Sequence, residues 1–433
     1  MNTLFALLVF VAFATAAVRQ WQWVEGNGKA PMELLTSAMV DTAASSVTLA
    51  LGLVGVMALF LGLMKVAEKG GVLILLARLI RPLMVRLFPD VPPEHPAMGA
   101  MIMNMSANAL GLGNAATPFG IRAMNELDRL NPHKGTASNA MALFLAINTS
   151  SVTLLPTSVI ALRASVHSND PAAILPTTLF ATFCSTLFAI IAVKGLQRFF
   201  PLPHALAQSS AKSPEPTTVA TVEDSSFTET GQGVSPWVSM VALLGLVGTI
   251  PLTIAYGRTL TPWIIPGLMV SLLVFGLWRR VAIYESFVEG AREGFDVAVR
   301  IIPYLVAILV AIGMFRASLA MDALVSWIAP WTTPWGLPAE ALPMAFLRPL
   351  SGSGAYGLMT SILQDPAIGP DSYTGMLVST IQGSSETTFY VLAVYFGAVG
   401  VSRMRHTLAA ALLSDVVAVI ASVAICTWLF PQG

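Results

Sequence analysis

Four clusters of hydrogen-bonding side chains interrupt apolar stretches of this 433-residue sequence, and their chemistry suits contact with a small polar molecule. Amide and hydroxyl groups supply both donors and acceptors. In lipid, the same groups also repair a broken helix or bond to a neighbouring helix, so both interpretations stay open. The candidate solute-binding residues are Asn104, Ser106, Asn108, Asn114, Asn148, Thr149, Ser150, Ser151, Ser351, Ser353, Gln382, Ser384, Ser385, Glu386 and Thr387.

Glu386 is the sharpest single candidate among these residues. An ionisable group at membrane depth costs about 3 kcal/mol or more, and it is a functional candidate by default. Glu386 would bind a proton or cation, which makes it the candidate coupling residue, or accept hydrogen bonds from a solute. The alternative is an ion pair with Arg348. In the first cluster Asn104 and Asn108 are favoured, because residues four apart share one helix face.

The remaining charged residues in apolar surroundings have simpler explanations. We expect Asp415 to lie near the membrane interface and to pair with Arg403 or Arg405, rather than to form a buried site. Asp41, Arg163 and Arg316 lie near predicted span ends, where long side chains reach water, and are expected to be interfacial.

Neither a metal site nor a catalytic site is predicted. His95 has no second histidine or carboxylate at a ligand spacing, so we expect a solvated loop histidine, no bound metal and no cofactor. The run from Ser351 to Gly354 lacks the strand and the Lys or His partner of a phosphate loop or a nucleophile elbow. The sequence therefore predicts a protein that is not an enzyme.

The composition indicates a polytopic membrane protein. Apolar residues make up 55% of the chain and charged residues 11%, and the mean hydropathy is +0.73. The 23 basic residues are balanced by 23 acidic ones, which leaves no surplus to bind nucleic acid. Cys184 and Cys426 both lie in apolar runs, so neither a disulfide framework nor a thiolate cluster is expected.

Long apolar stretches predict the membrane spans. A bilayer crossing needs about 20 apolar residues. Spans are predicted at 3–18, 47–64, 172–193, 238–256, 261–278 and 408–430, with a seventh at 301–315. Gly, Pro, Ser, Thr and Asn interrupt the stretches 96–120, 136–163, 341–363 and 373–401, which indicates broken or re-entrant helices. The first 17 residues also resemble a signal peptide, but no Lys or Arg precedes the apolar core, which favours a retained helix.

The chain divides into two membrane halves, 1–202 and 236–433, joined by a flexible cytoplasmic linker at 203–235. The linker holds 11 Ser or Thr, three Pro and five charges, with almost no large apolar residue. The halves share an order of features, and Ile147 and Ser150 recur as Ile381 and Ser384 at one fixed offset. The positive charges that follow residue 64 place that span end in the cytoplasm, with the N-terminus inside and the C-terminus outside. Spans 47–64 and 301–315 then run in opposite directions, so the halves form an inverted repeat.

Specific motifs add a family resemblance. The stretch from Leu51 to Ala164, with Leu110-Gly111-Leu112-Gly113-Asn114-Ala115-Ala116-Thr117-Pro118, resembles spore maturation protein A. The stretch from Pro236 onward, with Gln382-Gly383-Ser384-Ser385-Glu386-Thr387, resembles spore maturation protein B. Both belong to the group that carries the nucleoside recognition, or Gate, domain, which concentrative nucleoside transporters and the membrane part of ferrous iron transporters also contain. The resemblance implies a transport-like fold with paired gate elements and supplies no substrate. The gate-like segments of this sequence lack the cysteine residues of the iron transporters, which argues against an iron pathway.

Together these observations predict an all-α polytopic membrane protein with two inverted-topology Gate-like repeats and broken or re-entrant helices. We expect a transporter or permease-like protein of the bacterial inner membrane, with a small polar solute, nucleoside-like by resemblance, bound between the repeats. The alternative is a non-transporting membrane component of cell-envelope or spore maturation that binds an envelope intermediate or a partner protein. The lipid bilayer is the expected surrounding, and a homodimer is expected because twofold symmetry is the commonest closed arrangement.

Overall fold

The computed structural model describes residues 2–24, 28–201 and 265–430, together with a few isolated positions between 236 and 264. Within those ranges the regular elements are helices, and a single isolated bridge joins Thr136 to Arg403. The predicted linker at 203–235 and the predicted span at 238–256 lie outside the described residues, apart from isolated positions.

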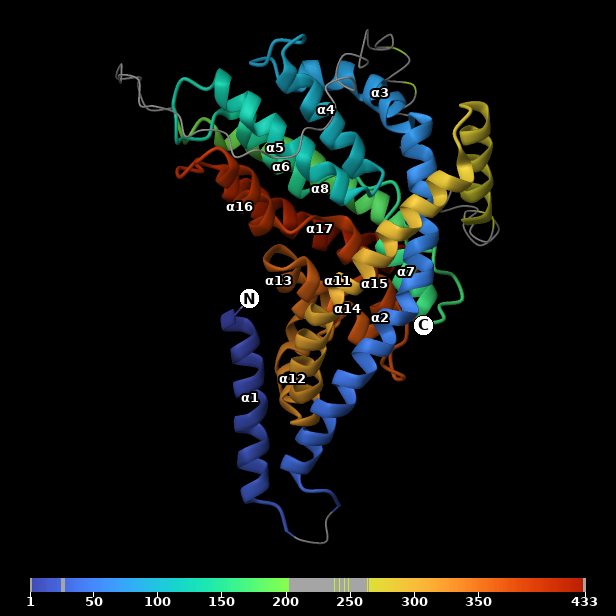
Figure 1. Cartoon of the computed structure of the whole chain (residues 1–433). Helices are drawn as coiled ribbons and strands as arrows, with labels where there is room; N and C mark the ends of the chain where they lie inside the picture. The colour runs from blue at the N-terminus through green and yellow to red at the C-terminus, as the bar shows by residue number, and fades with distance from the viewer. Residues whose placement is uncertain are drawn as a thin grey trace.

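The two halves of the chain repeat one order of helices (Figure 1). Each half begins with a long helix and one further helix. A first helix pair joined by a turn, a second pair separated by an extended break, and a closing span then follow. In the first half these follow α1 (Asn2–Trp21) and are α2 (Pro31–Gly70), with α3 (Val72–Leu87), α4 (Pro96–Ala109), α5 (Gly113–Leu130), α6 (Asn139–Thr149), α7 (Thr157–Ser165) and α8 (Leu175–Leu196). In the second half they are α11 (Ile283–Ala317), with α12 (Ala320–Thr332) and the 3-10 turn Thr333–Trp335, then α13 (Leu342–Leu350), α14 (Gly352–Leu363), α15 (Tyr373–Ser384), α16 (Thr388–Ala398) and α17 (Thr407–Leu429).

The long apolar helices match several of the predicted spans. Among the described residues, α2, α8 and α17 are long and apolar enough to cross a membrane. A fourth candidate is the pair Leu309–Ala317 and Ala320–Trp335, which bends by 83°. The predicted span at 301–315 therefore lies inside α11 and ends at this bend, where Leu319 has a φ of +64°. Shorter apolar helices cover Phe5–Trp21 and Ile265–Trp278.

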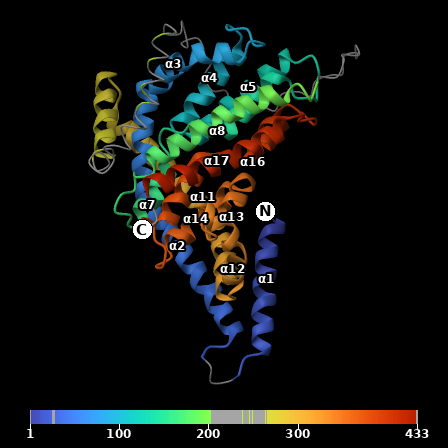
Figure 2. The ribbon, with the colours of Figure 1, turned by 180° about the vertical axis from the view of Figure 1, so that it is seen from behind.

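The corresponding helices of the two halves run antiparallel, which makes the repeats inverted. On the α2–α11 pair, Gly294 lies against Ala58 and Gly313 lies against Thr42, so one helix descends as the other ascends. On the α8–α17 pair, the Ser414 hydroxyl donates to the Ser185 carbonyl at 2.8 Å, whereas Thr177, near the start of α8, and Cys426, near the end of α17, both bond to the Thr380 hydroxyl. Figures 1 and 2 show both pairs lying side by side. The predicted inversion is confirmed.

A Gly-x-x-x-Gly spacing in α11 sets the close approach to α2. A Cβ atom on Gly290 would lie 2.4 Å from the Leu61 carbonyl oxygen, and one on Gly294 would lie 2.7 Å from the Ala58 Cα. Small residues on one face let helix backbones approach closely in a membrane, where packing replaces the hydrophobic driving force. The two glycines thus explain why the longest helices of the two halves cross in contact.

The hydrophobic clusters cross between the two halves. Val159 and Leu162 of α7 are buried in a cluster that α2 of the first half lines together with α14 and α15 of the second half. Val391 and Phe396 of α16 are buried in a cluster built mainly by the first half, where α16 contacts α5 and α6. Both breaks therefore lie where the two halves pack against each other.

Candidate functional site

The breaks of the two repeats meet at hydrogen-bonding distance. Helix α6 ends at Thr149, and the chain then runs without regular structure to Thr157. Helix α15 ends at Ser384, after which Ser385 is fully extended with φ −150° and ψ 164°. The Glu386 N–H donates to the Thr149 carbonyl at 2.8 Å. Helix C-termini leave up to four carbonyls without intrahelical partners, so two carbonyl-rich helix ends lie together here.

The turns of the shorter helix pairs close around this contact. Gly111, between α4 and α5, has a φ of +74°, and a Cβ atom there would lie 2.3 Å from the Leu155 carbonyl oxygen. Only glycine combines that backbone conformation with so close an approach. On the other side, the Ser351 hydroxyl caps α14 by accepting from the Gly354 N–H at 3.0 Å. A Cβ atom on the adjacent Gly352 would lie 2.6 Å from the Thr387 Oγ1, so each turn is in close contact with a break.

A cavity of about 420 Å³ lies where these elements converge. Its volume is in the range of roughly 300 to 1,000 Å³ that small-molecule sites occupy. The breaks and turns of both repeats line it with polar residues, namely Asn108, Thr153, Thr157, Ser158, Arg348, Ser353, Tyr356, Gln382, Ser385, Glu386 and Thr387, and the long helices add Lys65, Glu68 and Glu293. Such a lining of amides, hydroxyls and charged groups of both signs can hold a polar molecule through several hydrogen bonds.

Six of the predicted solute-binding residues line the cavity, namely Asn108, Ser353, Gln382, Ser385, Glu386 and Thr387. Asn148 lies directly behind Asn108, whose amide N–H donates to the Asn148 Oδ1 at 2.9 Å. The Asn148 amide donates in turn to the Phe144 carbonyl at 2.9 Å. Asn148 thereby fixes the orientation of the Asn108 amide that faces the cavity.

The other predicted residues bond within the protein. The Asn104 amide donates to the Ala116 carbonyl at 2.7 Å and to Tyr395 at 3.2 Å, which joins α4, α5 and α16. The hydroxyls of the buried residues bond to carbonyls of the preceding turn: Ser106, Thr149, Ser150 and Ser384. Ser151 is buried, and the Asn114 side chain lies outside what the structure describes.

Arg348 is the buried cation of the site. Its guanidinium donates to the Gln382 carbonyl at 3.1 Å, to the Thr387 hydroxyl at 3.0 Å and to the Ser385 carbonyl. A cation at the C-terminal end of α15 is stabilised by the negative end of the helix dipole. Glu386 approaches Arg348 only to 3.9 Å, and its side chain keeps 49% of its exposure. The Glu386 carboxylate therefore faces the cavity and remains available to a ligand.

Charged residues of the α2–α11 pair form the rim of the cavity. The Lys65 ammonium lies 2.9 Å from Glu293 and 3.4 Å from Glu68. Lys69 continues this network to Glu289 at 2.5 Å. The basic residues that follow the first long span thus join the two long helices beside the cavity, a pairing that their sequence positions do not reveal.

The prediction for Asp415 is wrong. Its carboxylate is 5% exposed and accepts a hydrogen bond from the Thr388 hydroxyl at 2.6 Å. It does not pair with Arg405, whose guanidinium donates to the Ala137 carbonyl at 3.0 Å and to the Phe200 carbonyl. The reason is geometric, because α17 begins at Thr407 and carries Asp415 two turns into the packed interior.

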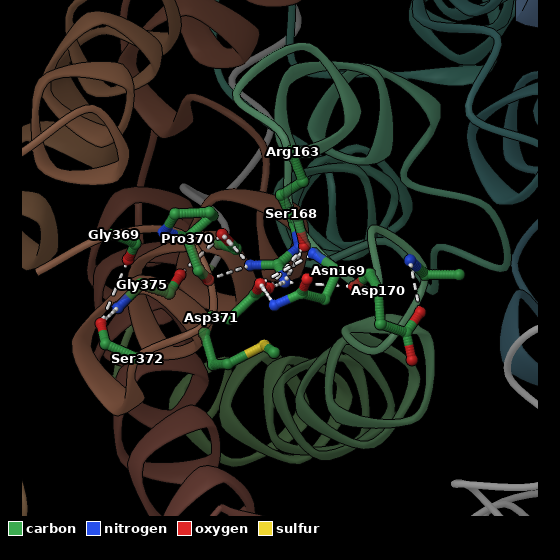
Figure 3. A network of polar contacts seen from close by, with 12 residues as sticks. Arg163, Ser168, Asn169, Asp170, Gly369, Pro370, Asp371, Ser372 and Gly375 are labelled. Atoms are coloured by element: carbon green, nitrogen blue, oxygen red, sulfur yellow. Dashed lines mark hydrogen bonds and ion pairs between the residues drawn. The ribbon is translucent and has the colours of Figure 1, made fainter. Parts of the chain in front are cut away.

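The prediction that the Arg163 side chain reaches water is wrong as well. Its side chain is 0% exposed and lies 3.1 Å from the Asp371 carboxylate (Figure 3). It also donates to the Pro370 carbonyl at 2.6 Å and to the Ser168 hydroxyl at 2.9 Å. Asp371 lies 208 positions away in the sequence, so no local pattern could have revealed the pair. We refer to Arg163, Ser168, Asn169 and Asp371 as the Arg163 clasp.

The remaining predictions concern metal ligands. His95 is half-buried and caps α4, since its Nδ1 accepts from the Ala97 N–H at 3.2 Å, so it is more ordered than a solvated loop residue. Among the described residues, no group of three or more His, Cys, Asp or Glu side chains is placed to hold a metal ion.

These features define an all-helical, multi-pass membrane protein with two inverted repeats of broken helices. A family model described as nucleoside recognition, the Gate family, matches residues 50–166 and 298–402. The two matches cover more than half of the chain and include the breaks of both repeats. The chain belongs to the Gate family.

Two relatives from Bacillus subtilis (strain 168) are similar to this chain over 166 residues each, 38% of its length. Spore maturation protein B is 47% identical with 92% of its own length covered, and spore maturation protein A is 45% identical with 83% covered. The predicted resemblance to a fusion of the two is confirmed. Among solved structures, CNTnw in an inward-facing substrate-bound state superposes with a TM-score of 0.44 at 14% identity, covering 98% of this chain and 91% of that one.

Proposed function

We propose that the chain is a transporter or permease-like protein of the bacterial inner membrane that binds a small polar solute, nucleoside-like in character, between its two Gate repeats. The observation that carries this proposal is the cavity, because the breaks of both repeats line it, with Thr153 on one side and with Ser385 and Glu386 on the other. The family description, nucleoside recognition, supports the choice of solute class.

The geometry suits a solute that needs directional hydrogen bonds. The Asn108 amide and the Gln382 side chain offer donors and acceptors, and Glu386 offers a carboxylate that is exposed to the cavity. Among these residues, Glu386 is the strongest acceptor for a sugar or base N–H or O–H group, because charged hydrogen bonds are roughly twice as strong as neutral ones.

Inverted repeats also suit alternating access. Two equivalent bundles with opposite orientation can exchange conformations, and the exchange opens the same central site first to one side and then to the other. The antiparallel α2–α11 and α8–α17 pairs supply that relation here. Coupling of transport to protons through Glu386 is a further part of the proposal.

The test is uptake of labelled nucleosides into liposomes that contain the purified protein, with empty liposomes as the blank. Glu386→Gln is expected to lower uptake at least tenfold and to abolish its dependence on pH. Glu285→Gln is the matched control, because Glu285 is exposed in the first turn of α11 and does not line the cavity. Equal uptake by wild type and Glu386→Gln at every pH would reject the role of Glu386.

A second candidate function follows from the names of the relatives. Both are called spore maturation proteins, which favours a membrane component that binds a cell-envelope intermediate without moving it. Binding of a nucleoside or envelope precursor to the purified protein without flux into liposomes would support this candidate over transport.

A further inference from the structure

Asp415 is a buried carboxylate that the proposed solute site does not use. It lies in α17 and is 5% exposed. One carboxylate oxygen accepts from the Thr388 hydroxyl at 2.6 Å, and the other is buried without any hydrogen-bond partner. Asp415 forms no ion pair within the described part of the chain. A group in this state is expensive as an anion.

The charged groups around Asp415 are few. Of the helices that pack against α17, α6 and α15 carry no Asp, Glu, Lys, Arg or His, and the charged residue of α8 is Lys194, near its end. From α13, Arg348 acts electrostatically on Asp415 and also on Glu386. Tyr390 and Tyr395 are the titratable residues of α16. One buried cation is therefore shared by two carboxylates.

The connection to the cavity is short. Thr388, which holds Asp415, is the first residue of α16, and the adjacent Thr387 hydroxyl accepts from Arg348 at 3.0 Å and lines the cavity. Three consecutive residues thus connect the two sites. Glu386 lines the cavity, Thr387 bonds to Arg348, and Thr388 bonds to Asp415. At the adjacent position of α17, the Ser414 hydroxyl donates to the Ser185 carbonyl and ties this helix to α8.

We propose that Asp415 is a proton-binding site behind the cavity wall, held by Thr388 and sharing Arg348 with Glu386. Uptake of one proton by the carboxylate removes the unpaired charge, and the proton supplies an O–H donor at a position where an oxygen is now unsatisfied. Release of the proton restores an anion that competes with Glu386 for Arg348.

This competition links the two sites. When Asp415 is charged, Arg348 is attracted by both carboxylates, and Glu386 is held less firmly. When Asp415 is protonated, Glu386 is the anion that remains beside Arg348. A proton at Asp415 therefore changes how strongly Arg348 holds the Glu386 carboxylate that a solute meets, and by linkage the solute changes the proton affinity of Asp415 equally. This second step rests on the proposed function, whereas the proton site itself does not.

Infrared spectroscopy of the purified protein in phospholipid vesicles tests the proton site without any transport measurement. Wild type is scanned from about pH 4 to pH 9, the range over which buried carboxyl groups titrate. We expect a C=O stretching band of a protonated carboxylic acid that disappears as the pH rises. Asp415→Asn should lack this band, whereas Glu386→Gln and the control Glu285→Gln should retain it. Persistence of the full band in Asp415→Asn, or its absence from wild type at every pH, would overturn the proposal.

Two further variants protect the test against misfolding. Asp415→Asn keeps the size of the side chain and an acceptor for Thr388, and its elution as a single species checks that it folds. If it does not, Asp415→Glu should retain a titrating band at a changed frequency, and an unchanged band would count against the proposal. Thr388→Val should shift the frequency, because it removes the hydrogen bond to Asp415. Absence of the titrating band from wild type with nucleoside uptake intact would refute this inference alone, and a titrating Asp415 without any uptake would refute only the proposed function.

Discussion

Removing the carboxylate of Asp371 is expected to lower the free energy of unfolding by about 3 kcal/mol. Breaking a buried ion pair by deleting one partner typically costs about 3–5 kcal/mol, because the other charge stays buried without compensation. The value falls at the lower end here, since the Asp371 side chain is 29% exposed and Arg163 keeps its bond to the Pro370 carbonyl.

Hydrogen bonds to the loop contribute to the same loss. Asp371 also accepts from the Ser168 hydroxyl at 2.5 Å and from the Asn169 backbone N–H at 2.8 Å (Figure 3). Asp371→Asn retains an acceptor but loses the charge, so we expect a smaller loss of about 1–2 kcal/mol. The order wild type, Asp371→Asn, Asp371→Ala should therefore hold for the stability of the folded protein.

The assay is thermal unfolding in detergent, followed by tryptophan fluorescence. A loss of 3 kcal/mol corresponds to a fall of roughly 3 °C in apparent melting temperature for a chain of this size. The control is Glu94→Ala, which breaks the Arg81–Glu94 pair at 2.9 Å, where Glu94 is 89% exposed. Such exposed pairs contribute about 0–1 kcal/mol. If Asp371→Ala melts within 1 °C of Glu94→Ala, the clasp does not stabilise the fold as argued.

Three further predictions concern packing, buried amides and pH. Gly294→Val places a side chain against the Ala58 backbone and should abolish recovery of monodisperse protein, whereas Gly195→Ala, at a position with no neighbour within 4 Å, should elute as wild type does. Asn104→Ala leaves the Ala116 carbonyl and Tyr395 without their donor and should cost about 1–3 kcal/mol in melting experiments, with little direct effect on solute binding, because Asn104 does not line the cavity. Burial and the neighbouring Arg405 lower the pKa of His406, in the loop before α17, to about 4. Because an unfolded histidine takes up its proton near pH 6.5, stability should fall by roughly 1–3 kcal/mol as the pH drops from about 6.5 to about 4, and His406→Gln should flatten that decline; parallel pH profiles for the two proteins would contradict it.

The sequence allowed the broken segments to be located because their physical cause is local. Pro96, Pro156 and Pro349 cannot continue a regular hydrogen-bond ladder, and the helices around them end or begin near the positions expected. The inverted repeat could also be predicted, because the positions of Lys and Arg and the order of features can both be read along the sequence. Among the polar candidates, however, the same residue types serve as cavity lining at Asn108 and as a structural tie at Asn104.

The neighbouring helices decide whether an asparagine of α4 lines the cavity or bonds within the protein. Asn104 and Asn108 share one face of α4, yet the first bonds to α5 and α16, whereas the second bonds to Asn148 near the end of α6 and faces the cavity. Arg163 and Asp415 show the same limit. Their sequence positions predicted a place at the interface, but Arg163 is buried beside Asp371 of the other half and Asp415 is buried beside Thr388 of α16.

The amino-acid sequence by itself determined the class of the protein, the helical repeats and the sites of the breaks, because hydropathy, proline and glycine act over a few residues. Only the tertiary structure decided which polar groups face the cavity, which carboxylate accompanies Arg348 and what holds Arg163. Those answers depend on partners about 30 to 200 positions away, and their contacts arise from the packing of helices rather than from any local pattern.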